Sequence, residues 1–393
     1  MLKLRSIYIM KKIIGNLKVN KNLQLMKYNK TIQNKLNISI LDYKKYNEIE
    51  IELKLENKKD SLCKVINTDE NDKSYIHIYI DNNKSEVNDN YIENKDNITK
   101  IKIKIDFEKK SLKGLFKNCD RIQEINFIKF NRKDIIDISE MFYECKSLIK
   151  LNLLNLKTNN VTNMAYLFYG CSSLEDINLS NFNTSNVKGM QYMFEKCSKL
   201  KSLDLNTFNT EKTVNMNDMF NRCKSLKNIN ISNFNTTNVI NMSYMFYECS
   251  SLEDLNLISF DTSKVIDMSY MFYNCDKIKK LNLSKFSTSN VINMSNMFEK
   301  CKNLNDLDIS NFEIKNNIRV RYMFSNCQNI LKNKIKAQFL SINNDAFDDN
   351  FRTDLYSFNS FNEEEIFYDL KSLFSLWELQ LIVGIFHLIF YIY

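Results

Sequence analysis

The stretch Met245-Phe-Tyr-Glu-Cys249 is one copy of a phrase, Met/Leu-Phe-x-x-Cys, that occurs nine times in the chain. Successive copies are separated by 26 residues without slip. A fixed period of this kind is typical of a solenoid, in which each repeat buries its apolar face only by stacking on its neighbours. The sequence therefore predicts a repeat fold and a binding scaffold. The phrase ends at Cys119, Cys145, Cys171, Cys197, Cys223, Cys249, Cys275, Cys301 and Cys327.

The first half of each repeat predicts a strand. Counting from the cysteine, the third, sixth and eighth residues are apolar, and in one repeat these are Leu252, Leu255 and Leu257. Leu-x-x-Leu-x-Leu is the strand segment of a leucine-rich repeat. A phenylalanine follows at the eleventh place and a threonine at the thirteenth, here Phe260 and Thr262.

The second half of each repeat has a different period. Val187, Met190, Met193, Phe194 and Cys197 have the spacing of one face of a short helix. We therefore expect each unit to be a strand, a turn and a helical turn, with Met, Phe and Cys pointing inward. An odd column of nine cysteines cannot pair completely, and cysteine is among the most buried residue types, so we expect a reduced core ladder.

The charge of the chain is concentrated at one end. The formal net charge is +8, yet residues 1–41 contain nine Lys/Arg and no acid, so the rest sums to about −1. A nearly neutral repeat array makes nucleic-acid binding unlikely. Apolar runs in the first 21 residues are broken by basic residues, so no secretory signal is predicted and a cytoplasmic location is expected.

Three segments before the repeats alternate strictly between apolar and polar residues, which predicts half-buried strands. They span residues 48–55, 75–80 and 100–105, and we expect a small β-rich cap that seals the first repeat. The first segment exposes Glu and the last exposes Lys, so opposite charges are expected to face each other across the sheet. The predicted domains are a basic leader at 1–40, the cap at 41–110, a solenoid of about nine rungs at 111–330, and a polar linker with a C-terminal apolar helix at 331–393.

The repeats resemble a known family. The run Asn241-Met-Ser-Tyr-Met-Phe-Tyr-Glu-Cys-Ser-Ser-Leu-Glu-Asp-Leu-Asn-Leu257, followed by Phe260-Asp-Thr-Ser-Lys-Val265, is similar to the BspA-type leucine-rich repeats of bacterial lipoprotein and surface proteins, with copies in microbial eukaryotes. The similarity covers about residues 115–330. It implies a right-handed superhelix and, for many members, display on cell surfaces for adhesion. The expected fold class is thus an α/β repeat solenoid with short parallel strands and a helical C-terminal segment.

Catalysis is not expected from the residue inventory. The two histidines, His77 and His387, are far apart in the sequence, and the cysteines lack the Cys-x-x-Cys spacing of zinc or redox sites. The five glycines are isolated, so no phosphate-binding loop is predicted. We therefore expect no enzyme activity, no metal and no cofactor.

The remaining candidate for function is the surface. Strand side chains between the leucines line the concave face of a leucine-rich solenoid, because alternate residues point to opposite sides. The seventh place after the cysteine is nearly always Asn, for which hydrogen bonding from rung to rung is one interpretation, whereas the fifth place varies and better suits selectivity. The predicted partner-binding residues are Lys150, Asn152, Asp176, Asn178, Ser202, Asp204, Asn228, Asn230, Asp254, Asn256, Lys280 and Asn282.

Two alternatives stay open. Tyrosines form two further columns, one with Tyr166, Tyr192, Tyr244, Tyr270 and Tyr322 and one with Tyr143, Tyr169, Tyr247 and Tyr273, and tyrosine is enriched at interfaces. The apolar tail at 379–393 can act as a C-terminal cap or as a membrane anchor. The expected function is a monomeric, non-catalytic scaffold that binds another protein, and the alternative is an adhesin-like protein at the cell surface or tethered to a membrane.

Overall fold

The computed structural model describes residues 45–349 except 57–61, 82–84, 88, 94–97 and 107–108. The described residues are mostly strands and turns with few helices, and their strands form no closed barrel. The strands are β1 (Ile49–Leu55), β2 (Leu62–Lys64), β3 (Ile76–Ile80), β4 (Glu86–Val87), β5 (Tyr91–Glu93), β6 (Ile101–Ile105), β7 (Ile122–Lys129), β8 (Lys150–Asn152), β9 (Ser202–Asp204), β10 (Asn228–Asn230), β11 (Lys280–Asn282) and β12 (Asp306–Asp308). The helical elements are α5 (Asn329–Gln338) and the 3-10 turns η1 (Glu70–Tyr75) and η2 (Asn344–Phe347).

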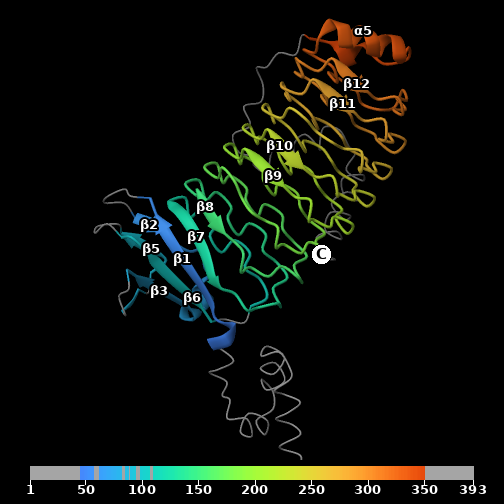
Figure 1. Cartoon of the computed structure of the whole chain (residues 1–393). Helices are drawn as coiled ribbons and strands as arrows, with labels where there is room; N and C mark the ends of the chain where they lie inside the picture. The colour runs from blue at the N-terminus through green and yellow to red at the C-terminus, as the bar shows by residue number, and fades with distance from the viewer. Residues whose placement is uncertain are drawn as a thin grey trace, which may run out of the picture. The chain divides into compact units, whose positions relative to one another are not determined.

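The three alternating segments form the predicted sheet. Strands β1, β3 and β6 pair antiparallel, and the sheet has the order β4-β3-β6-β1-β7-β8. The predicted charge pairing is confirmed, because Lys102 Nζ lies 2.8 Å from Glu50 Oε2 and Lys100 Nζ lies 2.6 Å from Glu52 Oε1. Strand β7 pairs antiparallel with β1 and parallel with β8, so the cap and the first repeats share one sheet (Figure 1).

The repeats stack in parallel with a register of 26 residues. Strand β9 pairs with β10 and β11 with β12, each pair offset by one repeat. A second column of parallel bridges joins equivalent residues of successive repeats from Ser111 to Arg319. We call each repeat a rung and name it by its cysteine. The strand pairing is interrupted at the Cys171 and Cys249 rungs, which contain no strand, so the short parallel strands of the array occur in pairs.

The predicted short helix in the second half of each repeat is wrong, and with it the α/β class. In the Cys197 rung the amides of Met193 and Cys197 donate to carbonyls three residues earlier, as in reverse turns. Tyr192 and Lys196 have φ of +58° and +59°, which is incompatible with a right-handed helix. The Tyr192 amide instead donates to the carbonyl of Asn217 in the next rung at 3.1 Å. Stacking between rungs therefore determines the backbone conformation where local periodicity favoured a helix.

The core consists of columns of identical side chains. The phenylalanine three residues before each cysteine stacks on its equivalents from Phe116 to Phe324, with centroid distances of 5.3–5.9 Å. The nine ladder cysteines are free and buried, as predicted. Each from Cys145 onward donates its S–H to a phenylalanine carbonyl of the preceding rung, for example Cys223 to Phe194 at 3.1 Å. Full burial of one such phenylalanine stabilises the fold by about 1.5–3 kcal/mol.

The threonine column joins the rungs by paired hydrogen bonds. The hydroxyl of Thr236 donates to the carbonyl of Asp261 at 2.8 Å and accepts from the amide of the same residue at 2.8 Å. The same pair of bonds recurs from Thr158, Thr184, Thr210, Thr262 and Thr288. Every member of the column is at most 1% exposed. Each hydroxyl thus satisfies two backbone groups that would otherwise be buried without partners.

The C-terminal end of the array differs from the predicted polar linker. Residues 329–349 form α5 and η2, and Phe347 stacks on Phe324 at 5.6 Å, which continues the phenylalanine column by one place. Leu331 and Ile335 of α5 are fully buried. Lys332 is 6% exposed and donates to Asp349 at 2.5 and 2.6 Å. Two buried aliphatic residues one turn apart are enough to dock this polar segment on the last rung.

The chain divides into two compact units, residues 1–349 and 350–393. The predicted leader at 1–40 and the predicted apolar helix after residue 361 lie outside the described residues. The predicted boundary at residue 110 separates no independent unit, because the cap sheet continues through β7 into β8.

Candidate functional site

The twelve predicted binding residues lie together on one exposed surface. They occupy the fifth and seventh places after the cysteine, and all of them are exposed to solvent. The residues between them are Leu or Ile, of which Leu203 and Leu281 are each 3% exposed and the others are half-buried against the core. We call this surface the strand face. It consists of Lys150, Asn152, Asp176, Asn178, Ser202, Asp204, Asn228, Asn230, Asp254, Asn256, Lys280 and Asn282.

The asparagines of the strand face do not bond from rung to rung, so that interpretation is wrong. The Oδ1 of Asn178 accepts the amide of Ser180 at 3.0 Å, which is a turn within its own rung. Asn152, Asp204, Asn230, Asn256 and Asn282 do the same. Each of these Oδ1 atoms therefore holds a turn within its own rung.

The fifth place carries the variable charges. At one end Lys150 Nζ lies 3.6 Å from Glu124 Oε1, and at the other Lys280 Nζ lies 3.7 Å from Asp306 Oδ2. The residues between these two ion pairs, in chain order, are Asp176, Ser202, Asn228 and Asp254. The lysines of the face are therefore matched by neighbouring acids, whereas its central carboxylates are not.

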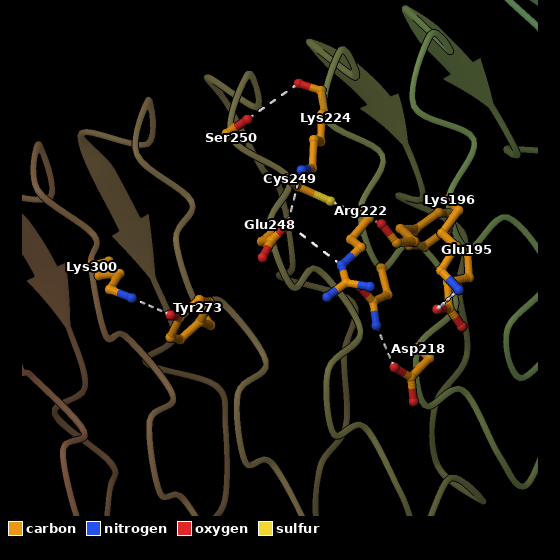
Figure 2. A network of polar contacts seen from close by, with 12 residues as sticks. Glu195, Lys196, Asp218, Arg222, Lys224, Glu248, Cys249, Ser250, Tyr273 and Lys300 are labelled. Carbon is orange, nitrogen blue, oxygen red and sulfur yellow. Dashed lines mark hydrogen bonds and ion pairs between the residues drawn. The ribbon is translucent and has the colours of Figure 1, made fainter. Parts of the chain in front are cut away.

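The tyrosine columns form a second surface, in which tyrosine rings stack on one another and cations lie over some of them. Tyr143 stacks on Tyr169 at 4.5 Å, and cations lie over both ends of this pair, Lys117 at 4.7 Å and Lys196 at 4.6 Å from the ring centroids. In a second pair Tyr247 stacks on Tyr273 at 4.6 Å, with Arg222 over Tyr247 and Lys300 over Tyr273. Figure 2 shows Lys300 beside Tyr273. Cation–π contacts of this kind stabilise exposed rings modestly. In the column of Tyr143, Tyr169, Tyr247 and Tyr273, each ring is thus covered by a stacked tyrosine on one side and by a cation on the other.

Buried carboxyl groups interrupt the tyrosine columns, and sequence reasoning missed them. Glu195 is 7% exposed and Asp218 is 8% exposed. Burial, reinforced by the charge of Asp218, raises the pKa of Glu195 to about 8. Burial also raises the pKa of Asp218, although Asn221 and Asn217 donate to its two oxygens at 2.6 and 2.8 Å. Figure 2 shows Asp218 and Glu195 on the same part of the array.

The contact between Asp218 and Asn221 has a counterpart three rungs later, in which the amide and the carboxyl have exchanged places. Asn296 donates its Nδ2 to Glu299 Oε2 at 2.5 Å, and Glu299 is fully buried. Burial raises the pKa of Glu299 against the opposing effect of Asn296. The signal in the sequence was the loss of tyrosine from its column at positions 195, 218 and 299. A polar residue in a column of half-buried tyrosines indicates a buried polar site.

The described residues hold no group of three or more His, Cys, Asp and Glu side chains that could bind a metal. Among the helices that the structure describes, none has both the length and the apolar character needed to cross a membrane. The apolar tail at 379–393 lies outside the described residues.

The comparison with protein families finds one match. A family described as "Mycoplasma protein of unknown function, DUF285" matches residues 110–228, 178–281 and 253–360. These overlapping matches together span residues 110–360, which is more than half of the chain. No curated protein matches the chain.

Proposed function

We propose, from the premise that the chain belongs to the DUF285 family of Mycoplasma proteins of unknown function, that it is a non-catalytic scaffold that binds another protein through the strand face. The observation that carries this proposal is the set of twelve exposed polar side chains on adjacent rungs. The Leu and Ile residues between them are buried or half-buried, so the exposed set is presented by a packed frame.

The finer fold assignment is part of the proposal. We propose a solenoid of the BspA-type leucine-rich repeat kind, with a right-handed turn and the strand face on its concave side. The Leu-x-x-Leu-x-Leu residues support this assignment, because their first and last positions are buried and the middle position is buried or half-buried; the 26-residue register and the parallel pairing of β9 with β10 and β11 with β12 support it as well. Other repeat families share some of these features, and the buried leucine pattern is the most specific of them.

The rigidity of the rungs favours recognition by this surface. Each rung is held by a buried threonine that bonds the next rung twice, and the asparagines are held by turns within their own rung. A surface that is already ordered loses less conformational entropy on association. The residues at the fifth place after the cysteine differ from rung to rung, whereas the frame is constant. These residues therefore determine which partner protein is selected.

Site-specific photo-cross-linking tests the proposed surface. A photoreactive residue is placed at Asn228, in the middle of the strand face, and a matched control is placed at Ile266, which is exposed outside it. In extracts of the source cells we expect a discrete protein adduct from position 228 and none from 266. Equal adducts from both positions, or an adduct from 266 alone, would contradict the proposal.

The location is a separate proposal, namely that the scaffold works in the cytoplasm. Protease treatment of intact and permeabilised source cells tests it, and we expect cleavage only after permeabilisation. Cleavage in intact cells, or retention in membranes after a carbonate wash, favours the adhesin-like alternative.

A further inference from the structure

The strands behind the strand face are grouped in pairs that single rungs separate. Strand β7 pairs with β8, β9 with β10 and β11 with β12. The Cys171 rung lies between the first two pairs and the Cys249 rung between the last two (Figure 1). The interruption therefore recurs after three rungs.

Backbone hydrogen bonds show where the rungs part. In each pair the amide at the fourth place after the cysteine donates to the same place in the preceding rung, as from Lys227 to the carbonyl of Lys201 at 2.9 Å. Among the described residues, the equivalent amides of Glu175 and Glu253 donate to no backbone carbonyl. The strand face is thus parted between β8 and the Cys171 rung, and again between β10 and the Cys249 rung.

The two partings uncover apolar side chains. At the sixth place after the cysteine, Leu151 and Ile177 on the two sides of the first parting are half-buried, and so are Ile229 and Leu255 on the two sides of the second. In the other rungs up to Cys301 this place is at most 3% exposed. Those buried residues are Ile125, Leu203, Leu281 and Leu307.

The loss of a backbone bond by itself does not uncover apolar surface. Within the described chain the amide of Lys279 also lacks the bond to the preceding rung, yet Leu281 in the same rung is 3% exposed. The half-buried pairs therefore mark the two partings as distinct places on the strand face.

An exposed aliphatic side chain accompanies each parting. At the ninth place after the cysteine, Leu154 is 54% exposed beside the first parting and Ile258 is 68% exposed beside the second. The rungs between and after them carry serine or asparagine at this place, so the frame does not require an apolar residue there. Those residues are Ser180, Asn206, Ser232, Ser284 and Ser310. We call Leu151, Leu154 and Ile177 the first apolar subsite, and Ile229, Leu255 and Ile258 the second.

The separation of the subsites fits an extended segment. They are three rungs apart, since Ile229 and Leu255 are the equivalents of Leu151 and Ile177. At about 4.8 Å per rung this separation is about 14 Å along the stack. In an extended segment, side chains four residues apart lie on the same face at about 13 Å from each other. On a helix the nearest spacings that return to the same face are about 10.5 and 16.5 Å.

The surface between the subsites is polar. Ser202, Asp204, Asn228 and Asn230 are exposed there, and their side chains can bond to the main-chain N–H and C=O groups of an extended segment. Charges of both signs lie beside the subsites, and Lys201 is paired with Glu175 at 2.6 Å. Apolar contacts therefore distinguish the subsites from the rest of the face better than charge does.

We propose that the partner protein binds the strand face through an extended segment with two bulky apolar side chains four residues apart, one at each apolar subsite. This inference rests on the proposed function, because it names the kind of segment that the same surface takes. Apolar anchors surrounded by polar contacts are the usual arrangement of a protein interface. The anchors fill the partings, and the polar residues between them hold the main chain of the segment.

A photoreactive peptide tests the subsites in the full chain. The probe is Ser-Thr-Leu-Ser-Thr-Ser-Leu-Thr-Ser, in which both leucines are photo-leucine, and mass spectrometry locates its adducts. We expect adducts at both subsites, within residues 151–154 and 255–258 or at Ile177 and Ile229. The control peptide Ser-Thr-Leu-Thr-Leu-Ser-Ser-Thr-Ser has the same composition with the leucines two apart, and its yield should be about tenfold lower because it reaches one subsite at a time. Equal yields from the two peptides, or adducts spread over the exposed surface, overturn the proposal.

Matched variants make the test specific. Leu154→Ser and Ile258→Ser together remove the exposed part of both subsites, and serine occupies the equivalent place in other rungs, so the fold is kept. The control is Ile240→Ser with Ile292→Ser, which removes two apolar residues that are 44% and 53% exposed outside the strand face. We expect the peptide adducts to fall about tenfold in the first variant and to stay in the control. Adducts that persist in the first variant overturn the proposal.

The photoreactive residue at Asn228 separates this inference from the proposed function. In extracts its adduct with the partner protein should fall about tenfold in Leu154→Ser with Ile258→Ser and stay in the control. A partner adduct that both variants retain leaves the scaffold function standing and overturns the apolar subsites. Peptide adducts at both subsites without any partner adduct in extracts support the subsites and contradict the proposed function.

Discussion

Replacing Glu195 by glutamine should remove the loss of stability at high pH that comes from ionisation of this one buried carboxyl. Glu195 is 7% exposed, and the charge of Asp218 adds to the effect of burial, so that the pKa of the Glu195 carboxyl is raised to about 8. Lys196 and Arg222 oppose this shift but do not cancel it. The carboxyl is therefore protonated in the folded chain at neutral pH.

The direction in which stability changes with pH follows from proton linkage. An acid whose pKa is raised in the folded state binds its proton more tightly there than in the unfolded chain, so its favourable contribution is lost as the pH rises. For Glu195 the loss begins near the usual pKa of 4.5 and is complete above about 8. At about 1.4 kcal/mol per pH unit, this interval corresponds to about 5 kcal/mol at pH 9. Glu195→Gln retains the shape of the protonated carboxyl and removes its ionisation.

Urea unfolding followed by circular dichroism, at pH 5 and at pH 9, measures the difference between the two chains. We expect little change at pH 5 and a gain of several kcal/mol for Glu195→Gln at pH 9. Because a repeat array can open locally, hydrogen exchange of residues 190–222 should show the same difference. The matched control is Glu175→Gln, since Glu175 is exposed and its pKa is lowered by Lys201. That control should bring no gain at pH 9.

Two results would refute this reasoning. One is a parallel decline of wild type and Glu195→Gln between pH 5 and pH 9, which would mean that Glu195 does not hold a proton in the folded chain. The other is a loss of stability in the variant at pH 9, which would mean that the ionised carboxylate is compensated by Lys196 or Arg222.

Three further predictions concern the frame. Thr236→Val should lower the free energy of unfolding by about 2–5 kcal/mol, because the amide and the carbonyl of Asp261 both lose their partner. Urea unfolding measures this free energy, and a change within error would contradict the role of the threonine column. Asp349→Ala should destabilise the C-terminal end by about 2–4 kcal/mol, because it leaves the buried Lys332 ammonium without its carboxylate. We expect faster hydrogen exchange confined to α5 and the last rung, and unchanged exchange in α5 would refute this prediction. Thiol titration should find almost no reactive cysteine in the native chain and all ten after unfolding without reductant, because burial raises the pKa of thiols such as Cys223 well above the usual value; fewer than ten would show that some are paired.

The strands of the cap could be predicted in type and charge because their period of two is a local property. Residues 48–55, 75–80 and 100–105 alternate between apolar and charged side chains, and β1, β3 and β6 lie within these ranges. The Glu side chains of the first segment and the Lys side chains of the last also predicted the charge pairing across the sheet. The order β3-β6-β1-β7 with its join to the first rung depends on contacts between distant residues, and no local pattern contains it.

The turns in the second half of each rung were misread for a physical reason. Apolar residues at Met190, Met193, Phe194 and Cys197 have helical spacing, yet this half of the rung packs them inward by successive turns with positive φ. A signal was present, since Asn or Gly precedes the cysteine at Asn118, Gly170, Asn274 and Asn326, and these residues tolerate positive φ best. Glu, Lys and Arg hold the same conformation before the cysteine in the other rungs, where the hydrogen bonds to the next rung compensate for the strain.

The sequence by itself determined the repeat, its 26-residue register, the buried columns and the exposure of the twelve strand-face residues, because a strict period forces equivalent residues into equivalent environments. Only the tertiary structure decided how the backbone turns within each rung, which side chains form ion pairs, and which polar groups are buried. The cations over Tyr143 and Tyr169 and the raised pKa of Glu195 arise from burial and from neighbours in other rungs. Burial and pKa depend on the whole surrounding volume, which a one-dimensional pattern does not contain.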